Sequence, residues 1–382
     1  GASYMYNGNS GIKPSEMPNE RLQWETSNQL DIGIEAGLFK NRIYVSADFF
    51  DKRTRNLLYE QKLPNTTGFS KFWTNLGKVR FWGYELELTT RNIVKKNFSW
   101  ESKLVLSYQQ NKVLKLPDNG IDKNRTGGIA LGDGTFFGGI AEGEPLNRFY
   151  GYVATGIIET EEQAANANYD ALSRLPQKGA KRVGDYEWAD RNGDGQITTA
   201  DQFCLGVTVP PFTGGLQNSF RLKNWTLSLY LDWATGHSIF DESYSRYFYG
   251  TFTNNYALAK DVLKAWKKPG DKTKYAKFYA NDSNWGNDNY NRSPTNTFTY
   301  KGDYLCLREI TLQYSLPSKL FTKVGLKGVT LTVSGNNLCY LTEVKGISPE
   351  TGASTTYEGS GDNAYYNYPP IRRFSFGVRL IF

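Results

Sequence analysis

One stretch of the chain has the residue types and the spacing of a calcium-binding loop. A twelve-residue calcium loop takes oxygen ligands from positions one, three, five, seven and twelve, with position seven using its backbone carbonyl. In residues 190–201 (DRNGDGQITTAD) these positions are held by Asp190, Asn192, Asp194, Gln196 and Asp201. Gly195 at position six permits the sharp turn that such a loop needs. The spacing therefore predicts a structural Ca²⁺ site that stiffens a loop.

Two features of this motif qualify the prediction. Asp201 stands where the usual ligand is a bidentate Glu, so coordination is expected to be weaker or completed by water. The same residues also form an Asn-Gly and an Asp-Gly pair, which make polar turns without any ion. No paired helices flank the loop, so we do not expect a calcium sensor.

Other chemistry finds little support, and we expect no enzyme. The chain has one His, at position 237, and neither a nucleophile elbow, a phosphate loop nor a dinucleotide fingerprint. Glu85, Glu87 and Glu101 resemble a glycosidase pair, but they recur at the period of a strand, which favours the lining of a polar channel. With three Cys and one His, zinc, haem and Cys-His catalysis are disfavoured.

Two cysteines and several aromatic residues leave alternatives open. Cys306 and Cys339 lie near the outer ends of successive predicted strands with apolar-face parity, where a simple register would set them opposite each other; a disulfide between them is left open. Aromatic rings in the long loops suit sugar stacking or peptide contact, and equally the packing of loops on one another. The candidate substrate-binding residues are Trp285, Tyr290, Tyr365 and Tyr366.

The elements that carry these residues are predicted to be β-strands. Aromatic residues make up 15% of the chain and there are 38 Gly, a composition typical of β-structure with many turns. A formal net charge of +7 without any Lys/Arg block gives no support for nucleic-acid binding. Nine segments alternate apolar and polar residues with a period of two. They are residues 29–39, 42–52, 79–91, 97–110, 213–222, 225–233, 304–316, 327–340 and 370–382.

The connections between these segments alternate between short and long. Residues 40–41 and 223–224 are two-residue links, whereas residues 113–212 and 234–302 are long connections. Short turns on one side and long loops on the other are typical of antiparallel transmembrane β-barrels. Because single-chain bacterial barrels close with an even number of strands, nine strands predict a fragment whose missing strands lie upstream. Within the second of these long loops, residues 256–268 are predicted to form an amphipathic helix, with Trp266 packing it onto the loop.

The last strand ends on Phe382 with no polar tail. A bare apolar edge invites aggregation in a soluble sheet, whereas a barrel closes on its last strand.

With these motifs in place, the chain resembles the carboxy-terminal part of the SusC/RagA-like TonB-dependent transporters of Bacteroidota outer membranes. The resemblance covers nearly the whole chain. It rests on residues 22–26 (LQWET), 33–39 (GIEAGLF), 83–88 (GYELEL), 190–195 (DRNGDG), 304–317 (YLCLREITLQYSLP), 333–338 (VSGNNL) and the terminal Phe382.

The resemblance implies an all-β outer-membrane protein in which residues 1–382 supply the last nine strands of a 22-stranded barrel, with long extracellular loops. It implies import of oligosaccharides or peptides, energised through TonB, with a SusD-like lipoprotein as lid. The plug domain and first strands are expected in the upstream half of the same barrel, and Phe382 is the expected assembly signal. Outer-membrane lipid would surround the wall.

Two other classes of protein remain as alternatives. One is a calcium-dependent surface β-protein that binds glycans, and the other is a passive porin. Detergent dependence separates the first from a barrel, and a plug with a TonB box separates the second from an active transporter.

Overall fold

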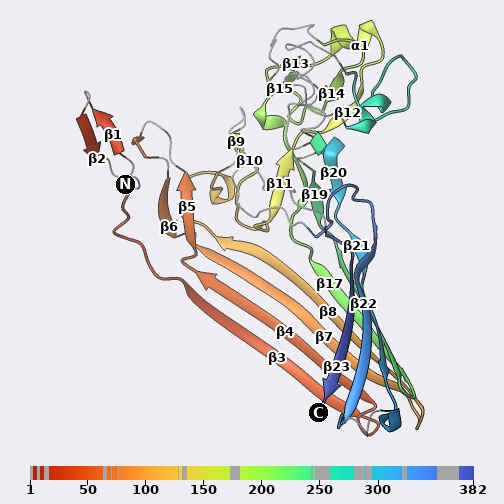
Figure 1. Ribbon diagram of the computed structural model, residues 1–382. Coiled ribbons are helices and arrows are strands. Elements are labelled where there is room, and N and C mark those ends of the chain that lie inside the picture. Colours follow the sequence, from red (N-terminus) through yellow and green to blue (C-terminus); the bar gives the residue numbers. More distant parts are fainter. Residues whose placement is uncertain are drawn as a thin grey trace.

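A computed structural model describes the chain except residues 1–2, 7–8, 13–16, 63–66, 70, 76, 128, 131–135, 173–180, 242–243, 246–258, 279–288, 290–294, 321–324 and 351–369. Its main feature is one sheet of 9 antiparallel strands (Figure 1). The strands are β3 (Thr26–Leu38), β4 (Ile43–Arg55), β7 (Lys78–Val94), β8 (Phe98–Lys115), β17 (Phe212–Leu222), β18 (Trp225–Thr235), β21 (Tyr304–Ser315), β22 (Gly328–Thr342) and β23 (Arg373–Ile381).

The strands of this sheet neighbour one another in the order in which they follow along the chain, from β3 at one edge to β23 at the other. The nine predicted strands are therefore confirmed as an up-and-down antiparallel sheet. Leu222 pairs with Trp225, which confirms the two-residue link between β17 and β18. The link between β3 and β4 was predicted two residues too short, because Leu38 pairs with Ile43 and positive φ angles run from Phe39 to Asn41.

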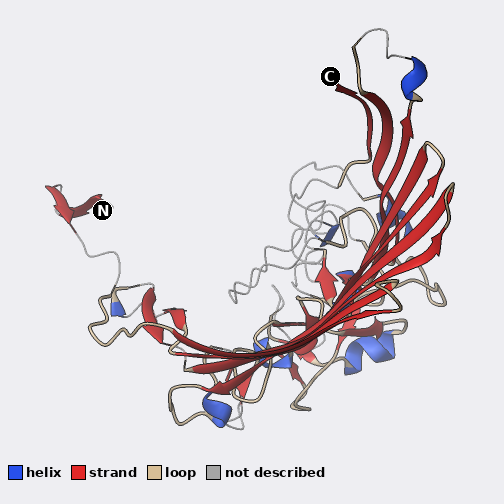
Figure 2. Cartoon of the chain, turned by 90° about the horizontal axis from the view of Figure 1, so that it is seen from below, coloured by secondary structure: helices blue, strands red, loops and turns tan. Residues whose placement is uncertain are grey.

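The two faces of the sheet differ in chemistry. On one face, here called the apolar face, Ile34, Phe376 and Val378 are exposed by 68%, 82% and 66%. The other, here called the polar face, carries acids such as Glu35, Glu85 and Glu87. Burying one large apolar side chain is worth about 1.5–3 kcal/mol, so such a face is stable only against an apolar medium. The sheet bends into an arc (Figure 2), as the wall of a barrel does.

Aromatic side chains gather at two levels of the apolar face. At the lower level, Phe98 pairs with Leu222, Leu222 with Trp225, and Trp225 with Tyr314. The upper level is a register row of Phe49, Tyr84, Tyr108 and Phe212. Phe98 and Tyr108 lie ten positions apart on β8. At about 3.3 Å per residue and a tilt of about 40°, the two levels are about 25 Å apart, the height of the apolar band of membrane barrels.

The long connections leave the sheet at one end, where they fold into a layer of short elements (Figure 1). This layer contains β9 (Ile129–Ala130), β10 (Phe136–Phe137), β11 (Arg148–Gly151), β12 (Ala154–Ile157), β13 (Tyr169–Asp170), β14 (Tyr186–Trp188), β15 (Gln196–Ile197), β16 (Phe203–Val207), β19 (Ser238–Phe240) and β20 (Thr299–Lys301). Its helices are α1 (Glu161–Asn166), η2 (Asp122–Asn124), η3 (Thr199–Asp201), η5 (Lys260–Lys264) and η6 (Asn296–Phe298). The remaining elements are β1 (Ser3–Tyr6), β2 (Asn9–Ile12), β5 (Leu58–Lys62), β6 (Lys71–Asn75) and η7 (Ser318–Leu320).

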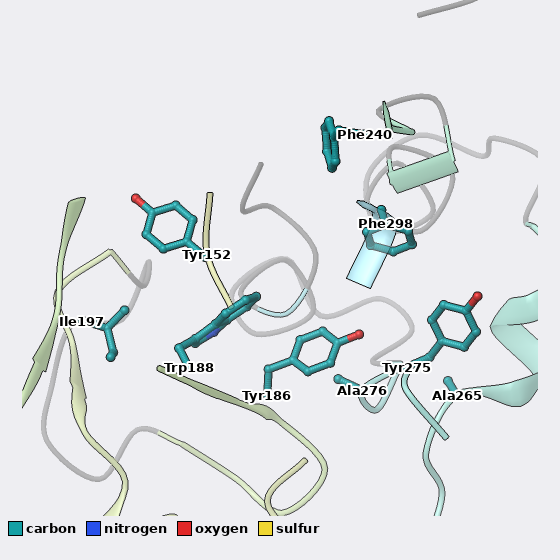
Figure 3. Packing of buried hydrophobic residues seen from close by; sticks show 9 residues of the cluster. All are labelled: Tyr152, Tyr186, Trp188, Ile197, Phe240, Ala265, Tyr275, Ala276 and Phe298. Carbon is teal, nitrogen blue, oxygen red and sulfur yellow. The ribbon is translucent and has the colours of Figure 1, made fainter. Parts of the chain in front are cut away.

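The loop layer has a hydrophobic core of its own (Figure 3). Its buried members are Tyr152, Tyr186, Trp188, Ile197, Phe240, Ala265, Tyr275, Ala276 and Phe298, which come from two different long connections. The connection between β8 and β17 and the connection between β18 and β21 therefore pack against each other through this core. Trp266 is buried, which confirms its packing role, but the predicted helix is wrong over its described part. Only η5 forms there, and Leu263 is 71% exposed.

No helix in the described part of the chain has the length and apolarity needed to span a membrane.

Candidate functional site

The polar face carries ion pairs between neighbouring strands. Lys103 Nζ lies 2.7 Å from Glu87 Oε1, and Arg91 Nε lies 3.5 Å from Glu101 Oε2. Both pairs join β7 to β8 across the register of the sheet. The acids that resembled a glycosidase pair thus include two with basic partners, which supports their reading as channel lining.

A small cavity opens on the polar face of β17, β18 and β21. It has a volume of about 140 Å³ and is lined by Gln217, Ser228, Leu229, Tyr230 and Glu309. Gln217 pairs with Tyr230, and Tyr230 pairs with Glu309, so these side chains form one row across three strands. Glu309 is fixed by Thr311 Oγ1, which donates at 2.6 Å, and by Asn336 Nδ2, which donates at 3.3 Å.

Arg308 lies next to this row, at a point where the register of the sheet shifts. The register shifts between Tyr230 and Leu231 on the β18 side of β21, and between Leu307 and Glu309 on the β22 side. Arg308 is the residue that both shifts leave unpaired, and Asn337 opposite it has a φ of 53°. A bulge of this kind re-aims a side chain, and bulges are frequent beside functional sites.

The guanidinium of Arg308 is held on all its donor edges. Its Nε and Nη2 donate to Asp232 Oδ1 and Oδ2 at 2.8 and 2.7 Å, a bidentate pair. Its Nη1 donates to Asn337 Oδ1 at 2.9 Å and to Tyr340 Oη at 3.2 Å. Nη2 also contacts Glu350, and Tyr340 Oη donates to Glu350 Oε1 at 2.7 Å. These residues are here called the Arg308 cluster.

The same irregularity decides the open question about the cysteines. Cys306 pairs with Tyr340, and Cys339 pairs with Leu307, so the two cysteines are not opposite each other. The bulge moves Cys306 onto the parity of the polar face, where it is buried, while Cys339 is exposed. All three cysteines are free thiols. The assignment of both cysteines to the apolar face was therefore wrong for Cys306.

The predicted calcium loop folds as a series of side-chain-to-amide turns. Asp190 accepts hydrogen bonds from Gly193 N and Gly195 N, each at 2.7 Å, and Asp194 accepts one from Gln196 N at 2.8 Å. Asn192 Oδ1 accepts from Asp194 N at 3.1 Å. Among the described residues, no group of three or more acidic, His or Cys side chains is arranged to hold a metal.

Asp201, the residue at position twelve, closes the loop through hydrogen bonds. It is fully buried, accepts from Arg191 N at 3.0 Å and from Thr198 N at 2.7 Å, and so closes the loop on itself. It also completes the capping box at the start of η3. Ile197, 1% exposed, fixes the loop from the other side by pairing with Asp170 of β13.

The other predicted site residues give less. Trp285, Tyr290, Tyr365 and Tyr366 lie outside the described residues. Phe382 is described and is 77% exposed beyond the end of β23. His237 is buried against Gly302, and its Nε2 lies 3.4 Å from the carbonyl oxygen of Pro349; burial lowers the pKa of this imidazole.

The sequence contains a signal for the Arg308 cluster, namely interruptions of the alternating pattern, which a search for regular strands does not detect. Within residues 304–316 the alternation breaks at Arg308 and Glu309, which are consecutive charged residues. The partner strand breaks its alternation at Asn336 and Asn337. Two breaks that face each other on neighbouring strands indicate a bulge and direct attention to the residue at its apex.

Comparisons with known proteins agree with this architecture. Residues 1–232 match the family model described as "TonB dependent receptor-like, beta-barrel". TonB-dependent receptor P3 of Formosa agariphila is 30% identical over 383 residues, covering 98% of this chain and 36% of the relative. TonB-dependent receptor SusC of Bacteroides thetaiotaomicron is 25% identical, covering 95% of this chain and 32% of the relative. The chain thus spans about a third of the length of these relatives.

A solved structure of the RagAB peptide transporter has the same fold. It superposes with a TM-score of 0.74 at 22% identity, covering 99% of this chain and 38% of that chain. The structure of the RagAB peptide importer in its "open-open" state gives a TM-score of 0.70. Together with the family model, which matches more than half of the sequence, these findings place the nine strands in the wall of an outer-membrane barrel. The chain belongs to the TonB-dependent receptor-like β-barrel family.

Proposed function

We propose that this chain is the carboxy-terminal part of an active importer that brings peptides or oligosaccharides across the outer membrane. The observation that carries the proposal is the two-faced sheet with a folded layer of loops at one end. An apolar face suits lipid, a polar face suits a water-filled path, and a packed layer at the mouth suits selection of what enters. A passive pore would need no such layer, although it would need the same wall.

The remainder of the barrel must complete this wall. The strands β3 and β23 are the two ends of the sheet, and each has one edge without a partner among the described residues. In lipid, unpaired N–H and C=O groups cost several kcal/mol each, so both edges need neighbours. We propose that strands from the upstream half of the same barrel, up to 22 in total, supply them, and that this half carries the plug domain and the contact with TonB.

The cargo and the lid are inferred from the names of the similar proteins. SusC and the RagAB transporter support a SusC-like protein of a Bacteroidota outer membrane, and the RagAB name supports peptide cargo. We infer a SusD-like surface lipoprotein as the partner over the loop layer. We infer no enzymatic activity, since the relatives named above are receptors.

The test is uptake by cells that carry the full-length gene, the gene deletion, or the gene without its plug-coding region. An importer loses uptake of labelled peptides or oligosaccharides in the deletion strain and in a strain lacking TonB. Uptake that persists without TonB overturns active import and leaves a passive porin. Uptake of neither cargo class by the wild type overturns the proposed cargo.

We also propose that residues 190–201 take up Ca²⁺. The side-chain oxygens of Asp190, Asn192 and Asp194 lie in one exposed turn, where they are within reach of solvent ions. Asp201 would act from behind by holding the loop closed, since both of its oxygens accept backbone N–H groups. Calorimetric titration of the full-length protein with Ca²⁺, against Mg²⁺ as the control, tests this proposal.

A further inference from the structure

The Arg308 cluster joins two parts of the chain that have different roles. Four members of the cluster belong to the strands of the sheet: Asp232, Arg308, Asn337 and Tyr340. The fifth, Glu350, follows β22 in the connection that leads toward β23. The preceding residue, Pro349, is buried and meets His237 of the loop layer. The end of this segment is therefore held at two points, by the contact of Pro349 with His237 and by the Glu350 carboxylate at the guanidinium.

The sheet residues form a preorganised receptor for a carboxylate. The bidentate pair with Asp232 fixes the plane of the Arg308 guanidinium, and Asn337 holds its Nη1 edge. With the guanidinium fixed, Nη2 of Arg308 and Oη of Tyr340 converge on the same oxygen, Oε1 of Glu350. Arg308 is suited to this task because its planar, always charged fork loses little freedom when it binds a carboxylate.

The two carboxylates of the cluster are held differently. Asp232 uses both oxygens and lies within β18, and its side chain is 15% exposed. Glu350 uses one oxygen, comes from outside the strands, and its side chain is 32% exposed. One guanidinium thus serves two carboxylates, of which Glu350 is the less firmly held and the more accessible to solvent.

We propose that Arg308 and Tyr340 form a subsite for the carboxylate of an imported ligand, and that Glu350 occupies this subsite until the ligand displaces it. The proposal rests on the proposed function, because it assumes that cargo passes along the polar face. The ligand chemistry is a carboxylate, carried either by an acidic peptide or by a uronic-acid oligosaccharide. A neutral sugar or a peptide without free carboxylates gains nothing from the exchange.

The exchange conserves charge. When Glu350 leaves, Arg308 and Asp232 remain as a neutral pair with an open donor edge, and the incoming carboxylate restores the original arrangement. An internal competitor lowers the apparent affinity of a ligand in proportion to the fraction of time for which the subsite is free. If Glu350 is bound for about nine tenths of the time, its removal should tighten carboxylate binding about tenfold.

The experiment uses the full-length receptor in detergent and isothermal titration calorimetry. The probes are triglutamate and trigalacturonate, with triglutamine and maltotriose as their neutral counterparts.

The variants are Glu350→Gln, which removes the competing charge and keeps the shape, and Arg308→Met, which removes the guanidinium that binds the carboxylate. Tyr340→Phe is the milder second variant, because it deletes one hydroxyl and leaves the Asp232–Arg308 pair in place. Glu343→Gln, an exposed acid of the same segment, is the matched control.

The proposal expects Glu350→Gln to bind at least one acidic probe about tenfold more tightly than the wild type, with neutral probes unchanged. A gain for triglutamate alone assigns the subsite to peptide carboxylates, and a gain for trigalacturonate alone assigns it to uronates. Arg308→Met and Tyr340→Phe should weaken acidic binding in the Glu350→Gln background. Equal affinities in Glu350→Gln, Glu343→Gln and wild type overturn the proposal, as does the absence of acidic binding in all of them. Uptake assays are independent of this result, so a subsite without uptake counts against the importer alone.

Discussion

The ring of Tyr230 covers Gly215 on the polar face of the sheet. A Cβ atom on Gly215 would lie 2.9 Å from Tyr230 Oη and 3.1 Å from Tyr230 Cε2. On the opposite face, a Cβ on Gly214 would lie 2.3 Å from Cζ2 of Trp233. Consecutive glycines in β17 therefore let one aromatic ring lie close to the backbone on each side of the same strand, and Tyr230 is thereby held at the wall of the cavity.

We predict that Gly214→Ala impairs assembly more than Gly215→Ala. The Gly214 methyl group meets the indole of Trp233 at several atoms, whereas the Gly215 methyl group meets the outer end of the Tyr230 ring, which can move into the cavity. Overpacking of this kind costs about 1–3 kcal/mol. The measurement is the midpoint of heat unfolding by electrophoretic mobility of the full-length barrel. Equal midpoints in both variants would contradict this ranking. Gly377→Ala, a strand variant whose Cβ would meet only Thr332 Cβ at 3.9 Å, is the control for an added methyl group without a clash.

The strands could be predicted from the sequence because apolar and polar residues alternate within each short segment, as at Trp225, Leu227 and Leu229. The face of Cys306 could not, since one extra residue at Arg308 inverts the parity of everything beyond it. The core of the loop layer is also absent from local pattern, because its contacts join distant segments. Tyr152, for example, bridges to Thr295. The Arg308 cluster can be predicted only when the break in alternation at Arg308 and the break at Asn337 on the neighbouring strand are considered together.

The loop layer should lose stability as the pH rises through the range of Asp241. This carboxyl is 2% exposed, and burial raises its pKa from 3.8 to about 6, although a hydrogen bond from Tyr244 N acts in the opposite direction. A raised acid pKa means that the folded state binds the proton more tightly than the unfolded state. The stabilisation is therefore complete below about pH 4 and is lost between about pH 4 and 6, a difference of about 3 kcal/mol.

Asp241→Asn should remove this pH dependence and slow amide exchange in the loop layer at pH 7. The Asn side-chain oxygen can still accept from Tyr244 N, while the buried charge is gone. The measurement is hydrogen exchange of the amides around β19 and β20 from pH 4 to 7 in the full-length protein, corrected for intrinsic rates. Asp271→Asn, an acid of the same layer whose pKa is lowered by the backbone amides of Lys267 and Lys268, is the control. A wild-type profile without a fall in protection between pH 4 and 6 would contradict the assignment.

Exchanging Asp190 and Asp194 together for Ala should loosen the long connection between β8 and β17 and leave barrel assembly intact. The loss includes the hydrogen bonds from Gly193 N, Gly195 N and Gln196 N, each worth about 1.5–3 kcal/mol when the acceptor is charged. Limited proteolysis reports the loosening. If the loop takes Ca²⁺, the wild type alone should also become more protease-sensitive in EDTA, and equal cleavage of the variant and the wild type under both conditions would refute the prediction.

The unreduced, denatured chain should expose three free thiols. Cys306 is buried on the polar face beside Tyr340, and Cys339 is exposed next to Leu307, so the bulge at Arg308 separates them. Titration with a thiol reagent in denaturant measures the number directly, with a reduced sample as the control. A value of one thiol before reduction and three after it would indicate a disulfide and would contradict the register of β21 and β22.

Deleting Phe382 should lower the amount of folded barrel in the outer membrane. Phe382 continues the apolar face of Phe376, Val378 and Leu380, is 77% exposed, and follows directly on Ile381, which pairs with Gly328. Because it lies one residue beyond the last paired position, its loss removes no ladder hydrogen bond from β23. A fall in membrane level would therefore reflect lost contact with lipid or with the assembly machinery, rather than a shortened sheet.

Phe382→Tyr, which keeps an aromatic ring at the end of the chain, should restore the level, whereas Phe382→Ser should not. Unchanged levels in the deletion and in Phe382→Ser, measured by surface labelling of the full-length protein, would show that the terminal aromatic residue is dispensable.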